Sequence, residues 1–391
     1  MRPEKLIDQE RPFEPGVCLY TRTDRGGILL GGNAPFFEVS GYPIDEMIGA
    51  PYRILRHPDM PRGLFHLFWQ RIESGRPFAG FLKDLAADGR HFWVCAIVLP
   101  TDDGYLSVRV KAQGPLFHLA RALYPDLLRA EGDGAQPADS AVLFRQGLER
   151  AGFPTLDVFM AEALADHSTD PALNGGCPVA RIRALRDDAR RLDDSRADLL
   201  ATLQKLYLIP TNMRILASRL EPSGGPISAI SDSYKRAASE LMARLNGRGM
   251  DRGGDGADPV ATALFRIAAA ATLARAERQF RAEPELPGID RELERAVVSA
   301  AARTLESDAT ASTAALAQDV ARIRKEAEQV KRMMSGLDQI RILGEVESGR
   351  MRHADGGLAA IMAQLTSFHG LIHTRLGAMT SVAGRLQAGV E

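Results

Sequence analysis

Short apolar runs alternate with turn residues along the first 113 residues, a pattern typical of β-strands joined by tight connections. Five runs fit strands, at 17–20, 28–30, 78–85, 91–99 and 105–110. The first two flank the sequence D-R-G-G at 24–27, and the next two flank A-D-G at 87–89. Aspartate and glycine at such positions favour hairpin turns, so we expect antiparallel pairing.

The stretch between the two strand pairs carries short helical pieces. Glycine and proline interrupt it at positions 41, 43, 49, 51, 58 and 61. Two strands, several short helices and three further strands predict an α+β domain. Its five-stranded antiparallel sheet should carry helices on one face.

Beyond this domain the spacing of apolar residues becomes that of helices. Residues 116–130 predict a connecting helix, and the Gly-, Pro- and acid-rich stretch 131–138 predicts a linker. From 179 onward apolar residues recur every three or four positions, as on amphipathic helices. We therefore expect an N-terminal segment at 1–14, the sheet domain at 15–113, connecting helices at 114–178 and an all-α bundle at 179–391.

The helical part contains two similar helix-tip-helix segments. Arg-Ile-Leu at 214–216 and again at 341–343 is followed in each case by a Gly-Gly tip, at 224–225 and 356–357. Two such hairpins in one chain can pack as a four-helix bundle. Chance similarity between amphipathic helices is the alternative.

Composition narrows the class of protein. The 391 residues carry 49 Lys and Arg against 50 Asp and Glu, so no net field attracts nucleic acid or an anionic membrane. The longest apolar stretch, Val260–Ala274, is too short to span a membrane and contains Arg266. The start of the chain has no signal-peptide pattern. The three widely spaced cysteines, at 18, 95 and 177, indicate neither disulfides nor a zinc site, and we expect a cytoplasmic protein.

Three strings in the sheet domain carry specific information together. Residues 33–42 are N-A-P-F-F-E-V-S-G-Y, residues 56–61 are R-H-P-D-M-P, and residues 80–94 are G-F-L-K-D-L-A-A-D-G-R-H-F-W-V. In this order they resemble the PAS domain of bacterial aerotaxis receptors, which holds FAD non-covalently. The resemblance covers residues 15–113, and the string at 56–61 is the discriminating one.

The resemblance implies a flavin site on Arg56, His57, Asp59 and Trp69. Trp93 on the central strands and Asp84 on the sheet are added by position, because aromatic rings and polar groups suit a planar isoalloxazine. Asp59 should also cap the helix that Pro61 opens.

Two positions depart from the family pattern. Members often carry Asn where this chain has Asp84, and Trp where it has Phe78. An amide both donates and accepts hydrogen bonds, whereas an ionised carboxylate only accepts. The alternatives to FAD are haem, with His57 or His66 as axial ligand, and no cofactor at all. Cys18 and Cys95 lie on predicted strands and should be buried and inert, so adduct-forming photochemistry is not expected.

The helical part resembles a shortened chemoreceptor. Residues 210–221, P-T-N-M-R-I-L-A-S-R-L-E, are similar to the signalling tip, although most small residues of the kinase contact are missing. The resemblance implies signalling partners such as a chemotaxis kinase, its adaptor or a receptor array. A different partner and a simple dimerisation bundle are the alternatives, and a homodimer stays open.

No enzyme class fits the chain, because it has no kinase, cyclase or phosphate-loop signature. Two hypotheses follow. The first is a cytoplasmic redox or oxygen sensor of the aerotaxis type that relays its signal through residues 116–130 to the helical bundle. The second is a cofactor-free PAS scaffold that docks to signalling proteins.

Overall fold

The computed structural model describes residues 3, 5–167, 178–206, 208–219, 225–245, 258–350 and 356–390. Contacts divide the chain into two units, residues 1–180 with 260–312, and residues 181–259 with 313–391. The spacing of apolar residues predicted that residues 260–312 belong to the helical bundle. They pack instead with the sheet domain, because their buried side chains meet its strands.

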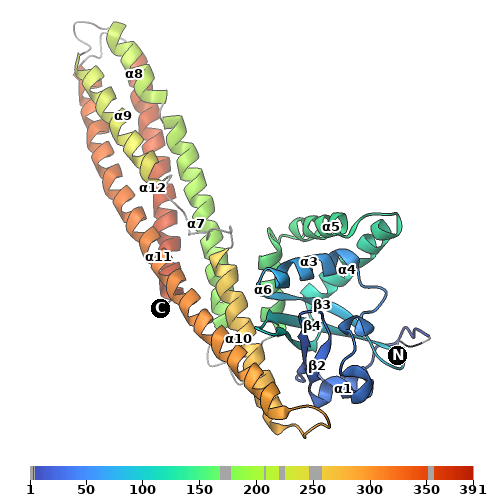
Figure 1. The fold of residues 1–391 in the computed structure, drawn as a ribbon. Coiled ribbons are helices and arrows are strands. Elements are labelled where there is room, and N and C mark those ends of the chain that lie inside the picture. The colour runs from blue at the N-terminus through green and yellow to red at the C-terminus, as the bar shows by residue number, and fades with distance from the viewer. Residues whose placement is uncertain are drawn as a thin grey trace. The chain divides into compact units, whose positions relative to one another are not determined.

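The first unit contains a five-stranded antiparallel sheet in the order β2-β1-β5-β4-β3. The strands are β1 (Leu19–Asp24), β2 (Leu29–Gly32), β3 (Phe78–Leu85), β4 (His91–Pro100) and β5 (Gly104–Lys111). This confirms the α+β fold predicted from the strand pattern. Figure 1 shows the strands with helices around them.

Short helices connect β2 to β3: α1 (Ala34–Ser40), α2 (Ile44–Met47), a 3₁₀ turn (Tyr52–Leu55) and α3 (Arg62–Glu73). Asn33 caps α1 by accepting a hydrogen bond from the Phe36 amide, and Gly41 ends it with a φ of 71°. Only glycine adopts that conformation without steric cost, so the N…G spacing of the first motif sets both ends of α1.

Successive side chains of each strand point to opposite faces of the sheet, so the register defines an inner and an outer face. The inner face meets α3, where Phe78 contacts Phe68 with ring centroids 5.2 Å apart. The outer face meets later helices, and there Trp93 lies 5.2 Å from Phe117. The two faces are separate environments.

Three helices that follow the sheet return to it: α4 (Pro115–Gly132), α5 (Pro137–Arg150) and α6 (Leu156–His167). The Tyr124 hydroxyl of α4 donates to the Phe81 carbonyl at 2.7 Å, and α6 packs against β3 and β4. The predicted linker at 131–138 is only a short turn between α4 and α5.

The first unit is completed by α10 (Pro259–Ala282) and the beginning of α11 (Arg291–Arg350). Phe280 of α10 packs edge-to-face on Tyr20 of β1, with 5.6 Å between ring centroids. In the sheet register Tyr20 is opposite Val108 of β5, and Val108 is opposite Ile97 of β4. Side chains in register point to the same face, and Ile97 shares the outer face with Trp93, so α10 lies on the outer face.

The second unit is helical and contains α7 (Pro178–Leu206), α8 (Leu208–Arg219), α9 (Gly225–Leu245), the rest of α11, and α12 (Gly356–Val390). A buried chain of polar groups joins three of them: Tyr234 bonds His369, whose Nδ1 lies 2.6 Å from Asp338. Burial lowers the pKa of His369 to about 4, so this histidine is neutral.

The structure shows unequal environments for the two Arg-Ile-Leu segments. Leu216 is buried, whereas its counterpart Leu343 is 56% exposed. The Gly-Gly tips lie outside the described residues or at their margin. The two segments are therefore both helical but are not equivalent in packing.

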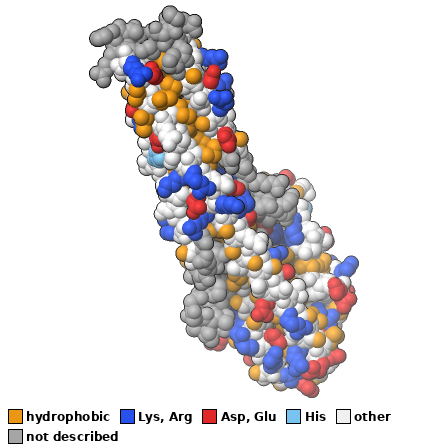
Figure 2. Space-filling view, turned by 90° about the vertical axis from the view of Figure 1, so that its left-hand side faces the viewer, with side chains coloured by type: hydrophobic (Ala, Val, Ile, Leu, Met, Phe, Trp, Pro, Cys, Tyr) orange, Lys and Arg blue, Asp and Glu red, His pale blue; other side chains and the backbone are white. Residues whose placement is uncertain are grey.

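Figure 2 shows Lys and Arg interspersed with Asp and Glu over the visible face, in keeping with the balanced charge of the chain. Among the described helices, none has the length and apolar character needed to cross a bilayer.

We predict that Tyr124→Phe lowers the stability of the first unit by about 1–2 kcal/mol, because it removes the buried hydrogen bond to the Phe81 carbonyl. Both tryptophans of the chain lie in this unit, so tryptophan fluorescence during thermal unfolding reports it alone. Tyr105→Phe, at a half-buried ring, is the control and should have little effect. Equal effects of the two variants would contradict the prediction.

Candidate functional site

A buried polar cluster lies on the inner face of the sheet. Asp84 of β3 and Arg109 of β5 are 3% and 2% exposed, and the Arg109 Nε lies 3.7 Å from the Asp84 carboxylate. The Tyr52 hydroxyl donates to the same carboxylate at 3.5 Å, and the Arg109 guanidinium lies over the Tyr52 ring. Arg109 also donates to the Thr21 hydroxyl at 2.9 Å.

The cluster is not fully satisfied within the protein. The buried Nε of Arg109 has no hydrogen-bond partner. Burial raises the pKa of Asp84 to about 6, although Arg109 and Tyr52 oppose the shift. Buried polar groups are normally hydrogen-bonded, so a guanidinium nitrogen without a hydrogen bond and a carboxyl with a raised pKa make this cluster a candidate site for a polar ligand.

The discriminating segment 56–61 lies at the edge of the sheet beside β3. Arg56 pairs through its backbone with Asp84, while its side chain donates to the Met60 carbonyl and lies 3.9 Å from the centre of the Phe65 ring. His57 donates its amide to the Lys83 carbonyl and accepts the Asp59 amide on Nδ1. The segment therefore holds itself in place with its own side chains.

His57 is buried and neutral. Burial, with Lys83 nearby, lowers its pKa to about 4. Its Nδ1 is already engaged by the Asp59 amide at 3.1 Å, an arrangement that favours a structural role in the loop. His66, the other haem candidate, is exposed on α3.

The predicted helix cap by Asp59 is wrong. Pro61 is the residue before α3, and the Asp59 carboxylate instead bonds Lys83 at 2.6 Å. Glu131 at the end of α4 accepts the Arg62 and Gly63 amides, both at 2.8 Å. A distant carboxylate therefore fills the position that a local cap usually takes.

The two tryptophans lie on opposite sides of the sheet. Trp69 on α3 is half-buried and contacts Tyr105 on the inner face, with ring centroids 5.8 Å apart. Trp93 lies on the outer face beneath α4, stacked against Tyr124. Trp93 is therefore separated from the Asp84 cluster by the sheet itself.

Of the sequence-predicted site residues, the structure brings Asp84 into the inner cluster and places the Arg56 backbone beside it. His57 and Asp59 form a neighbouring loop, and Trp93 lies apart. Tyr52, Arg109 and Thr21 were not predicted from the sequence as site residues. Arg109 had a detectable signal, because it is a charge in the middle of the apolar strand 105–110.

The prediction that Cys18 and Cys95 are buried is confirmed. Cys18 and Cys95 are buried with free thiols, and burial raises the pKa of both. Cys177 lies outside the described residues. Within the described ranges no group of three or more His, Cys, Asp or Glu side chains is arranged to hold a metal ion.

Two curated proteins resemble the chain in sequence. It is 32% identical over 127 residues to the aerotaxis receptor of Escherichia coli, covering 31% of this chain and 25% of the receptor. It is 32% identical over 82 residues to the biofilm dispersion protein BdlA of Pseudomonas aeruginosa, covering 21% of this chain and 20% of that protein. The chain thus spans about a quarter or less of the length of either relative.

Solved structures with a partial likeness come from light-oxygen-voltage domains. One is a domain studied with a flavin analogue, at 19% identity over 30% of this chain and a TM-score of 0.23. Another is the blue-light photoreceptor Aureochrome1 in its light state, at 20% identity over 29% of the chain and a TM-score of 0.22. Scores this low do not bear on the ligand of the chain.

The family model described as the PAS fold matches residues 17–110, which include β1 to β4, α1 to α3 and all but the last residue of β5. The similarity to the aerotaxis receptor agrees with the motif at 56–61. The chain therefore contains a PAS domain of the aerotaxis-receptor type.

Proposed function

We propose that the PAS domain binds a flavin, FAD in the first instance, on its inner face and senses redox state or oxygen. The signal would pass to the helical part of the chain and on to signalling partners. The observation that supports this most is the buried cluster of Asp84, Arg109 and Tyr52, in which the Arg109 Nε makes no hydrogen bond.

The donor set of this cluster suits the polar edge of an isoalloxazine. That edge presents an N–H donor between two carbonyl oxygens. Arg109 offers donors to a carbonyl, and the Asp84 carboxylate accepts from an N–H. Trp69 and Tyr52 add aromatic surface on the same side of the sheet.

The aspartate that replaces the family's asparagine is compatible with this role. With its pKa raised to about 6, Asp84 is partly protonated in mildly acidic solution and then both donates and accepts, as an amide does. When ionised, it places a negative charge beside the ring edge. The departure therefore makes binding and redox state dependent on pH.

We further propose a cytoplasmic location and partners drawn from chemotaxis-type signalling: a kinase, its adaptor or a receptor array. The sequence similarity to the aerotaxis receptor and the residues 210–221 support this choice. We propose a role in relay and not in catalysis, because the sequence carries no kinase, cyclase or phosphate-loop signature. A homodimer is compatible with this function.

The alternative function is a cofactor-free PAS scaffold. The contact between Asp84 and Arg109 favours it, because each group partly neutralises the other without any ligand. In that case the inner cluster would serve to specify the fold, as buried ion pairs do in some proteins.

An absorbance spectrum of the purified full chain, before and after incubation with FAD, tests the proposal. We expect the two visible bands of an oxidised flavin and their loss on reduction. A haem spectrum would contradict the flavin and favour the haem alternative. A colourless protein that takes up neither FAD nor haem would contradict the flavin proposal and support the cofactor-free PAS scaffold.

Arg109→Gln should weaken flavin binding about ten- to a hundredfold, because it removes a charge-assisted hydrogen bond. Titration of the variant with FAD, followed by flavin fluorescence, measures the loss. Trp93→Phe, on the outer face, is the matched control and should bind as the parent does. Equal loss in both variants would place the flavin elsewhere.

We predict that Asp84→Asn changes how the stability of the ligand-free domain depends on pH. A buried acid whose pKa rises from 3.8 to about 6 destabilises the fold as pH increases through that window, because folding then opposes ionisation. Relative to the parent, the variant should gain up to about 3 kcal/mol between pH 4 and pH 7. Thermal unfolding followed by tryptophan fluorescence at several pH values measures this.

Asp88→Asn is the control for this experiment. Desolvation alone would raise the pKa of Asp88, but the hydrogen bonds from Arg90 and the charges of Arg11 and Arg90 together lower it. Its replacement should therefore shift the pH dependence in the opposite direction, with the parent gaining relative stability as pH rises. A change of the same sign in both variants would contradict the assignment of the Asp84 shift to burial.

A further inference from the structure

The loop region joining α10 and α11 is attached to the PAS sheet by polar side chains. The Gln279 side chain accepts the Cys18 amide at 2.7 Å and donates to the Cys18 carbonyl at 2.9 Å. The Gln279 side chain therefore makes paired hydrogen bonds to the backbone just before β1, and these fix α10 at the start of β1.

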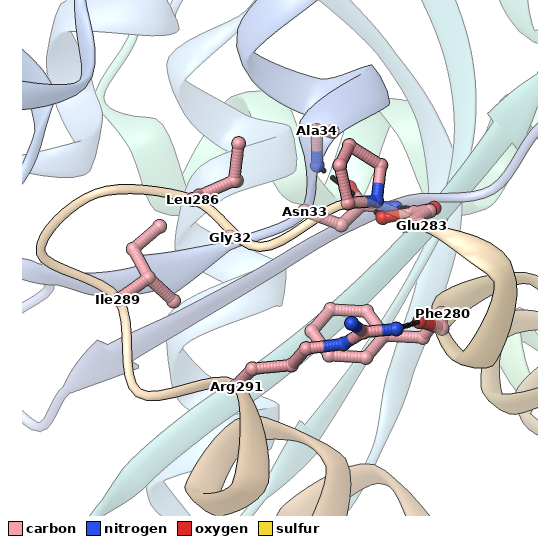
Figure 3. A pocket seen from close by; sticks show the side chains of 9 residues that line it. Gly32, Asn33, Ala34, Phe280, Glu283, Leu286, Ile289 and Arg291 are labelled. Carbon is pink, nitrogen blue, oxygen red and sulfur yellow. Dashed lines mark hydrogen bonds between the residues drawn. The ribbon is translucent and has the colours of Figure 1, made fainter.

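Glu283 extends the attachment to α1. Its carboxylate accepts from the Asn33 side chain at 2.9 Å and from the Ala34 amide at 3.3 Å. Figure 3 shows Glu283 directed at these two residues, and Arg291 reaching back to the Phe280 carbonyl across a small pocket. The motif that starts at Asn33 is thus in contact with the connection between α10 and α11.

Glu294 of α11 makes the most deeply buried contact. It is 1% exposed, receives a hydrogen bond from the Tyr20 hydroxyl, and forms an ion pair with Arg22 at 2.7 Å. A side chain at Gly31 would meet the Glu294 carboxylate, whose Oε1 lies only 2.3 Å from an ideal Cβ position. Gly31 therefore leaves a slot that the carboxylate fills.

β1 connects this contact with the inner cluster. Tyr20 and Arg22 point to the outer face, where Glu294 lies, and Thr21 between them points to the inner face. The Thr21 hydroxyl accepts from Arg109, whose Nε is 3.7 Å from Asp84. Polar groups thus follow one another from Asp84 on β3 through Arg109 on β5 to β1, and β1 links the inner face with Glu294 on the outer face.

We propose that Glu294 is the positioning residue through which α11 responds to the state of the Asp84–Arg109 pair. This makes α11 the output helix of the PAS domain, in place of residues 116–130. As a route for a flavin signal the inference rests on the proposed function, but the coupling between Asp84 and Glu294 does not require a cofactor.

The topology favours α11 over α4 as output. α4 is held to the domain by Tyr124 and Glu131, and α5 and α6 return to the same unit. α11 starts at the Glu294 contact and continues as one helix to Arg350, past the boundary between the two units. A change in its first turns is therefore passed on along a continuous helix.

Hydrogen–deuterium exchange of the full chain tests the coupling. Asp84→Asn perturbs the inner cluster, and peptides from residues 291–312 report the first turns of α11. We expect Asp84→Asn to change the amide exchange rate of these peptides by a factor of about two to thirty, which corresponds to the range of coupling energies along side-chain networks. In a Glu294→Gln background the same substitution should have no effect.

Glu292→Gln is the matched control, because Glu292 lies in the same turn but is exposed and should leave the response intact. Gly31→Ala expels the carboxylate without changing any charge, and should abolish the response as Glu294→Gln does. A response that survives both Glu294→Gln and Gly31→Ala overturns the proposal. So does a response confined to peptides of α4.

The outcome is separable from that of the flavin proposal. A colourless protein in which Glu294→Gln abolishes the response would refute the flavin and support the coupling. A flavin-loaded protein in which Asp84→Asn leaves the exchange of the α11 peptides unchanged would support the flavin and refute the coupling. In a flavin-loaded protein, Glu294→Gln should leave the absorbance spectrum unchanged, since Glu294 lies on the opposite face from the cluster.

Discussion

The alternation of side chains along β1 is the constraint on which the arrangement of the first unit depends. Because consecutive residues of a strand face opposite sides, Thr21 joins the inner cluster while its two neighbours hold α11. A shift of one residue in the register would exchange these roles and place Arg22 in the core. The register of β1 therefore fixes the site and its attachment to the helices together.

Buried charge explains why such contacts are specific. A carboxylate removed from water costs more than its ion pair returns unless several partners satisfy it. Glu294 has two close partners, whereas Asp84 has a distant guanidinium and a weak hydroxyl contact. Glu294 is therefore suited to a permanent attachment of α11 to the sheet. Asp84 is a group whose protonation and pairing respond to what lies beside it.

The sequence was sufficient for the sheet domain and for part of the candidate site, but not for the packing of residues 260–312. Strand alternation and turn residues located the five strands within a few residues, and the motif at 56–61 indicated the type of PAS domain. The sequence grouped Trp93 with Asp84 in one site, but the two residues lie on opposite faces of the sheet. An aromatic residue on a strand that is covered on both sides carries no signal of the face to which it points. The prediction that Asp59 caps α3 was wrong for another reason. The carboxylate that accepts the first amides of α3 belongs to Glu131, which lies 69 residues from Arg62 along the chain.

Glu294 shows the limit of local patterns most clearly. It lies 272 residues from Arg22, in the first turn of a helix where an acidic residue is ordinary because it favours the helix dipole. Only the tertiary fold shows that this carboxylate is buried against β1. Residues 116–130 follow the sheet directly, and sequence adjacency made them the natural choice of connector. Adjacency in space instead favours α11, because this helix combines a buried contact to the sheet with a continuous path into the second unit.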